Sequence, residues 1–277
     1  MSDNLFPSFA SAVEPPITVP YFWWKNGNVA LKQVSETLYY GGWLAKAEEV
    51  MAAASDNGYD MGLVEANFEA VTMVFEHEGE VPHFGNRALV IAPIAFRKSW
   101  FNKELRRRSP SYFPGSRQHV QVLTFLGIRD AERVIHPWGI VVLSAKGFNG
   151  GYLLQALRKS LDATRKACRQ FGVDEAPHTF WHMVGTFGPE RTSKTVGKGQ
   201  TSTITPIMPH LAPIDSKERL MVRYVGDEVK AQMVEALASF RDWLDAWNEE
   251  SGEDDEAQPH MQGAAVMAEA TEDEIPW

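Results

Sequence analysis

The chain has 277 residues, of which 44% are hydrophobic and 23% charged, ordinary values for a globular protein. Its single cysteine, Cys168, excludes an internal disulfide framework, and no apolar run approaches the ~18 residues of a membrane span. The first residues lack the basic start and apolar run of a signal peptide, so we expect a cytoplasmic protein with no membrane partner.

The net charge of −9 is concentrated at one end of the sequence. Arg241 is the last basic residue, and many acidic residues follow Asn248. Residues 1–248 hold 27 bases and 26 acids, a balance of +1, whereas residues 249–277 carry −10. This asymmetry indicates a role with nucleic acid or with a regulated partner.

In chain order, the first feature is the aromatic run from Tyr21 to Trp24, of which we expect two side chains to be buried. Residues 35–54 have a weak helical pattern. Short runs rich in β-branched and aromatic residues then predict strands, and Pro93 within one of them predicts a bulge or an edge strand. The predicted strands cover residues 69–76, 87–96, 119–128, 138–145, 179–187 and 219–225.

Two further stretches, 152–171 and 228–248, have apolar residues at helical spacing. Together these elements predict an α+β fold, with a β-barrel or a strongly bent antiparallel, OB-like (oligonucleotide-binding) sheet and two or three helices. We expect this body to occupy residues 1–248, with an N-terminal extension over residues 1–30.

The segment Ala95–Arg117 combines basic residues with aromatic residues and contains one acidic residue, Glu104. Single-stranded nucleic acid offers phosphate charges and unstacked bases, which such residues neutralise and stack on. The alternative is that the aromatics belong to the core and the arginines to a solvated face. Taken as a whole, the segment favours the binding interpretation. Its candidate nucleic-acid-binding residues are Arg97, Lys98, Trp100, Phe101, Lys103, Arg106, Arg107, Arg108, Tyr112, Phe113 and Arg117.

Two secondary basic features agree with binding. One is a helix face with Arg158, Arg165 and Arg169, and the other is the polar, basic loop at 189–202.

Signatures of enzymes are missing from the sequence. The glycines at 147–151 and 197–199 do not have the spacing of nucleotide-binding loops. His178 and His182 are four residues apart but lack the glutamate of a zinc helix, and Cys168 lies on an apolar stripe. We therefore expect a protein that is not an enzyme, with no catalytic residue, no cofactor and no metal.

Residues 249–271 combine acids, Gly, Gln and Ala with no aromatic residue, a composition that predicts a disordered acidic linker. The six residues that follow, 272–277, read EDEIPW and place an apolar group beside the terminal carboxylate. We expect a partner-binding tip here, made of Asp273, Glu274, Ile275, Pro276 and Trp277.

This tip resembles the C-terminal end of bacterial single-stranded DNA-binding proteins, in which several acids precede Ile-Pro-Phe. Here Trp277 replaces the Phe, and some of the acids are Glu. The resemblance implies that the tip docks in basic-rimmed apolar pockets of replication, recombination and repair proteins. It also implies that the acidic end can compete for the protein's own basic groove.

The resemblance is confined to the tail. The body is longer than the usual domain of that family, and it is either a divergent phage or plasmid version or an unrelated fold with the same tip. Pairing of edge strands into a homo-oligomer is compatible with a barrel.

We therefore expect a non-enzymatic, nucleoid-associated protein that coats single-stranded DNA and recruits partners through its tip. One alternative is a protein that anneals strands or mediates recombination. Another is an interaction protein or inhibitor that presents the tip without binding DNA.

Overall fold

Ten strands pair into one large mixed sheet in the computed structural model, which describes residues 14–27, 40–75, 79–102, 104–187, 194–197 and 202–248. Every pair is antiparallel except β1 with β8, so the expected all-antiparallel sheet is corrected at this position. In sheet order the strands are β12 (Met208–Pro209), β9 (His182–Gly185), β5 (Ala88–Asn102), β7 (Arg117–Arg129), β8 (Ile135–Lys146), β1 (Tyr21–Gly27), β2 (Tyr40–Lys46), β4 (Gly79–Asn86) and β3 (Glu69–Phe75), and β6 (Arg107–Ser109) pairs with β5. A separate ribbon joins β10 (Lys194–Val196) to β11 (Ser202–Ile204).

The sheet is strongly bent. In sheet order β2 lies five strands from β9, which in a flat sheet would separate them by about 24 Å. Yet the indole nitrogen of Trp43 in β2 donates a hydrogen bond of 3.1 Å to the carbonyl oxygen of Val184 in β9. The sheet therefore curls around its core, but no ladder among the described strands joins β3 to β12. The α+β class is confirmed, whereas the sheet is open and not a closed barrel.

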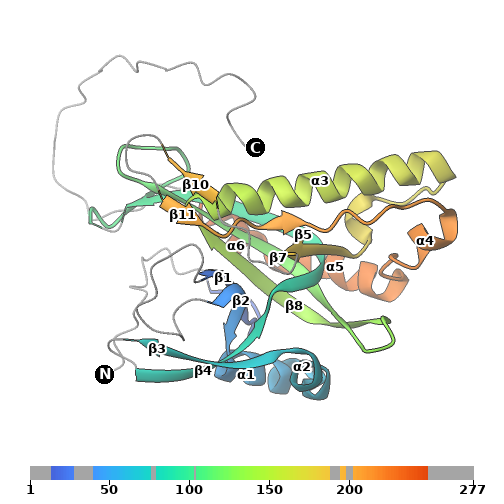
Figure 1. The fold of residues 1–277 in the computed structure, drawn as a ribbon, viewed down its shortest axis with the longest axis horizontal. Coiled ribbons are helices and arrows are strands. Elements are labelled where there is room, and N and C mark those ends of the chain that lie inside the picture. Colours follow the sequence, from blue (N-terminus) through green and yellow to red (C-terminus); the bar gives the residue numbers. More distant parts are fainter. Residues whose placement is uncertain are drawn as a thin grey trace, which may run out of the picture.

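Helices cover both faces of the central strands β5, β7 and β8 (Figure 1). The long helix α3 lies along one face, and α5 and α6 lie against the other. The described residues form six α-helices, more than the two or three expected, because the stretch 228–248 is divided into two helices and two short helices, α2 and α4, had no predicted counterpart. Their bounds are α1 (Ala47–Asn57), α2 (Met61–Asn67), α3 (Phe148–Phe171), α4 (Lys217–Met221), α5 (Asp227–Ser239) and α6 (Arg241–Asp245), and a short 3₁₀ turn covers Pro177–Thr179.

Two segments differ from the sequence-based expectation. The stretch 219–225 is not a strand, because Ser216 caps a short helix there by accepting a hydrogen bond of 3.2 Å from the Arg219 amide, and Leu220 is buried. The first half of the described part of 35–54 is strand β2, and only its second half belongs to a helix.

The main core lies on the concave face of the bent sheet, under α1, α2 and α3. Phe22 and Trp24 belong to it, so two of the four residues in the aromatic run of β1 are buried, as expected. On the opposite face, α5 and α6 bury a second apolar layer that includes Leu123, Phe240 and Trp243.

A β-bulge next to Pro93 changes which side of β5 faces the core. Pro93 pairs with Thr124 and Ala95 with Leu123, so Ile94 is an extra residue. Thr124 stabilises the site through a hydrogen bond of 2.8 Å from its hydroxyl to the Ala92 carbonyl oxygen. Before the bulge, the side chains at odd positions of β5 lie on the concave side of the sheet. After the bulge, the side chains at even positions lie there instead. The bulge alternative for Pro93 is confirmed.

No helix within the described ranges is long and apolar enough to cross a membrane.

Candidate nucleic-acid interface

The segment 95–117, which we call the arm, is the far end of the β5–β7 hairpin. Within β5, only Ala88–Ile91 pair with β9, so the rest of β5 extends past β9 and pairs with β7 and the short β6. The strands place Trp100 opposite both Gln118 of β7 and Ser109 of β6. Most of the candidate DNA-binding residues are thus held on a three-stranded extension of the sheet.

Strand alternation divides these residues between two faces of the arm. Phe96, Lys98 and Trp100 lie on one side, which we call the open face. Arg97 lies on the other side, which the C-terminal helix covers.

Arg97 on the covered face is a packing residue. Its guanidinium carbon lies 3.5 Å from the ring centre of Trp243 and 4.2 Å from that of Trp247. It also donates hydrogen bonds to the Gln121 side chain, at 2.8 Å, and to the Trp243 carbonyl oxygen. Such cation–π contacts join the arm to α6 and the residues after it.

Arg108 on the same face is held in a similar way. It lies 4.1 Å from the ring centre of Trp247 and donates a hydrogen bond of 3.3 Å to the Ser99 hydroxyl. Burial lowers the pKa of Arg97 to about 9 and that of Arg108 to about 10, so both remain charged at neutral pH. These two arginines serve the fold, and their charges lie partly under tryptophan rings.

The open face presents aromatic rings to solvent. Phe96 is 58% exposed and Tyr112 is 64% exposed, unusual values for large aromatic side chains. The rings of Trp100 and Tyr112 meet edge to face with centroids 5.1 Å apart, which fixes the orientation of this pair. Phe113 is half-buried, and the guanidinium of Arg107 lies 4.9 Å from its ring centre.

Cations lie among these rings. Lys98 is exposed between Phe96 and Trp100 on the same side of β5, and Arg107 is opposite Asn102 in the ladder with β6. A single nucleic-acid strand could stack its bases on these rings while its phosphates contact Lys98 and Arg107.

The remaining predicted residues fall into three groups. Arg106 is exposed in the turn before β6, and Arg117 is exposed at the start of β7. Phe101 is half-buried on the covered face, with its ring centre 6.0 Å from the guanidinium carbon of Arg108. Lys103 lies outside the described residues. The predicted linker 249–271 and the tip residues Asp273, Glu274, Ile275, Pro276 and Trp277 also lie outside them.

The sequence did not reveal that α3 begins directly beside the open face. The Gly147 amide donates a hydrogen bond of 2.6 Å to the Gln118 carbonyl oxygen, and a Cβ at Gly150 would lie 3.1 Å from the Val120 side chain. Gln118 and Val120 are the ladder partners of Trp100 and Lys98. The positive end of the α3 dipole, with no acid in its first turn, therefore adjoins the open face.

Phe148, the first residue of α3, is a further large aromatic side chain that is 51% exposed, and it follows Gly147, whose amide bonds to β7 beside the open face. It was missed because the helical pattern was recognised only from residue 152. The signal that could have found it is the Gly147–Phe148–Asn149–Gly150 stretch after a strand, where glycines allow a helix to start close to the sheet.

Two arginines of the predicted basic helix face have an acidic neighbour. On α3, Asp162 accepts from Arg165 and lies 4.0 Å from Arg158, so these charges are partly neutralised. Of the predicted loop 189–202, residues 194–196 form β10 and residue 202 begins β11, and residues 189–193 and 198–201 lie outside the described part of the chain. The β10–β11 ribbon lies toward the same end of the long axis as the start of α3 (Figure 1).

The described residues contain no group of three or more His, Cys, Asp or Glu side chains that could hold a metal ion. Cys168 is buried, and burial raises the pKa of its thiol, which makes it a poor nucleophile.

Comparisons with protein-family models, with curated proteins and with solved structures find no match to this chain. Its function therefore has to be argued from its own residues.

Proposed function

We propose that this protein is a non-enzymatic single-stranded DNA-binding protein that coats the strand without sequence preference. The observation that carries the proposal is the open face of the arm, where exposed Phe96 and the Trp100–Tyr112 pair surround Lys98. Rings that stack on any base, together with cations that meet phosphates, give affinity without sequence readout. The bent sheet would hold this surface as a small OB-like barrel does in the family that the tip resembles.

In this proposal the acidic tail is the recruiting element. Ile275 and Trp277 would fill an apolar pocket on a replication, recombination or repair protein, and a basic residue there would bind the terminal carboxylate. Pro276 restricts the backbone of the tip, which lowers the entropy lost on docking.

The test is fluorescence anisotropy of labelled oligo-dT and of a duplex of equal length across a salt series. We expect tight, salt-sensitive binding to oligo-dT that the duplex does not share. Phe96→Ala should weaken this binding by about 1–3 kcal/mol, because one stacked base is lost. Lys98→Gln should reduce the salt slope by about 0.7, because one phosphate contact is lost.

Arg97→Lys is the matched control, since Arg97 is adjacent in sequence but lies on the covered face. It should lower the free energy of unfolding, because lysine cannot reproduce the stacked guanidinium, and leave the salt slope unchanged. No binding to oligo-dT by the full chain would refute the proposal. Accelerated pairing of complementary oligonucleotides in the same buffers would instead assign the protein to strand annealing.

A further inference from the structure

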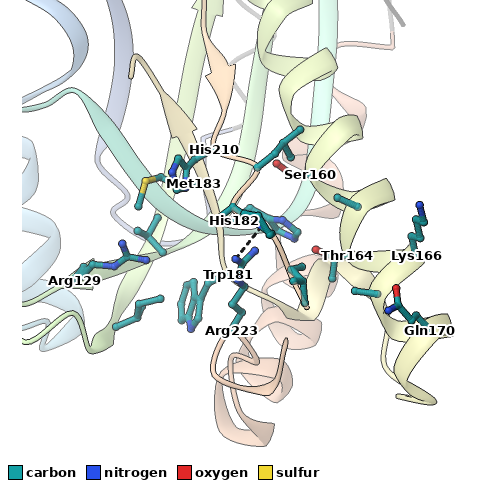
Figure 2. Close-up of a pocket in the computed structure, with 18 residues that line it drawn as sticks. Arg129, Ser160, Thr164, Lys166, Gln170, Trp181, His182, Met183, His210 and Arg223 are labelled. Carbon is teal, nitrogen blue, oxygen red and sulfur yellow. Dashed lines mark hydrogen bonds between the residues drawn. The ribbon is translucent and has the colours of Figure 1, made fainter. Parts of the chain in front are cut away.

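A cavity of about 410 Å³ lies between α3, β9 and the segment 210–214, far from the arm. Arg129 lines it at the end of β7, twelve residues and roughly 40 Å along the strand from Arg117. Figure 2 shows residues of α3 on one side of this cavity and Arg129, Trp181 and Arg223 on the other. Its size is typical of a small-molecule site.

The cavity is electrostatically positive. Arg129 and Arg223 both line it, and none of the 18 lining residues is acidic. Burial, with a further contribution from the charge of Arg129, lowers the pKa of Arg223, as expected for two cations that face one space. Arg223 donates a hydrogen bond of 3.2 Å to the Ala212 carbonyl oxygen, which holds its side chain in place.

A buried hydroxyl on the α3 side has no partner. Ser160 is only 4% exposed, and its Oγ has no hydrogen bond within the described part of the chain. A buried hydroxyl without a partner is costly, so a hydrogen bond supplied by a ligand in the cavity would stabilise it. Figure 2 shows Ser160 and Thr164 on the side of α3 that faces His182.

The wall between the arginines and the serine is mainly apolar. Trp181 and Ile135 line it on one side, and Ile214 and Ala163 also contribute. Trp181 is fixed by its packing against Phe125, with ring centroids 6.5 Å apart.

We propose that this cavity binds an organic phosphate monoester of about mononucleotide size. Its phosphate would lie between Arg129 and Arg223, because a dianion matches two guanidinium groups that face no acid. Its body would lie against Trp181, and a polar group at the far end would bond to the Ser160 hydroxyl. Both a free mononucleotide and the 5′-terminal nucleotide of a DNA strand have this chemistry. The proposal does not depend on the function proposed for the arm.

The test is isothermal titration calorimetry of the full chain with thymidine 5′-monophosphate, thymidine, inorganic phosphate and 5′-phosphorylated dinucleotide. We expect saturable binding of the monophosphate and none of thymidine. Arg129→Gln should weaken binding at least about tenfold, because a charged hydrogen bond is lost. Ser160→Ala should weaken it by a smaller factor. Arg129 is exposed and Ser160 small, so both variants should fold.

Arg165→Gln, on the outward side of α3, and Phe96→Ala, on the arm, are the matched controls and should bind the monophosphate normally. Binding of the dinucleotide equal to that of the monophosphate would identify the DNA end as the source, and weaker binding would identify the free nucleotide. Monophosphate binding that survives both Arg129→Gln and Ser160→Ala would overturn the proposal. The proposal would also be overturned if inorganic phosphate bound and the monophosphate did not, or if none of the ligands bound.

Discussion

At the scale of single residues, neighbours in the sequence have separate roles. Arg97 lies between two tryptophan rings, whereas Lys98, one residue later, is exposed among aromatic side chains. Their charges are equal, but only the second is available to a phosphate. A count of basic residues in the arm therefore overstates the number that an anion could reach.

His182 is a buried residue that makes stability depend on pH. It is 5% exposed, its Nε2 donates a hydrogen bond of 2.9 Å to the Pro177 carbonyl oxygen, and burial lowers its pKa to about 4. An unfolded histidine has a pKa of about 6.5, so the unfolded chain binds more protons between pH 6.5 and pH 4. Stability is therefore lost as pH falls through this window and is unaffected by His182 above it.

We expect His182 to account for about 3 kcal/mol of lost unfolding free energy between pH 7 and pH 4. Denaturant unfolding at a series of pH values measures the slope. His182→Gln keeps a donor for the Pro177 carbonyl but does not titrate, so its slope should be flatter than that of the wild type. Equal slopes would show that His182 does not couple folding to pH.

At the scale of elements, the pairing of β9 with β5 depends on a glycine. Gly185 pairs with Ala88, and a Cβ there would collide with the backbone of Arg87 and Ala88. We expect Gly185→Ala to destabilise the fold by about 3 kcal/mol or more, since backbone atoms cannot move aside as side chains can.

Thermal and urea unfolding of Gly185→Ala measure this cost. Gly62→Ala is the control, because its nearest neighbour is the exposed Asp60 carboxylate at 3.1 Å, and it should change stability little. A Gly185→Ala variant as stable as this control would mean that β9 pairs less closely than described.

The elements that the sequence predicted well are those with a strong, regular pattern. Strands β7 and β8 and helix α3 agree with the predicted ranges to within a few residues, because long apolar runs and a long amphipathic stripe have few alternatives. Strand β5 begins as predicted but continues to Asn102, six residues beyond the predicted end. Strand β1 was seen only as an aromatic run, since both its faces are partly covered. The stretch 219–225 has strand-like residues, but the N-cap at Ser216 and the burial of Leu220 stabilise a short helix at its start.

The candidate site could be predicted only as a segment. Composition identified the arm. The placement of Arg97 and Arg108 on the opposite face from Lys98 depends on the bulge and on distant tryptophans. Trp243, for example, lies 146 positions after Arg97 in the sequence. The cavity around Ser160 left no local signal, because its residues come from α3, β7, β9 and the segments after them.

At the scale of the whole molecule, charge separates the body from the tail. Residues 1–248 are nearly neutral, and residues 249–277 carry −10. If the tail competes with DNA for the basic surface of the body, a chain that ends at Asn248 should bind oligo-dT about tenfold more tightly at low salt.

Anisotropy titrations of the full and shortened chains test this competition. The difference should vanish near 1 M salt, where the Debye length is about 3 Å. Equal affinities at about 10 mM salt would exclude competition by the tail, and a difference that persists at high salt would exclude an electrostatic cause.

The bulge at Ile94 has a consequence for how the arm tolerates change in length. One extra residue there sets which positions face outward. Its removal would therefore turn Phe96, Lys98 and Trp100 toward the side of Trp243 and Trp247, and Arg97 toward solvent. A substitution near Pro93 changes the structure only locally. A deletion of one residue there would exchange the two faces of the part of β5 that follows the bulge. The spacing of this stretch is therefore under stricter constraint than its composition.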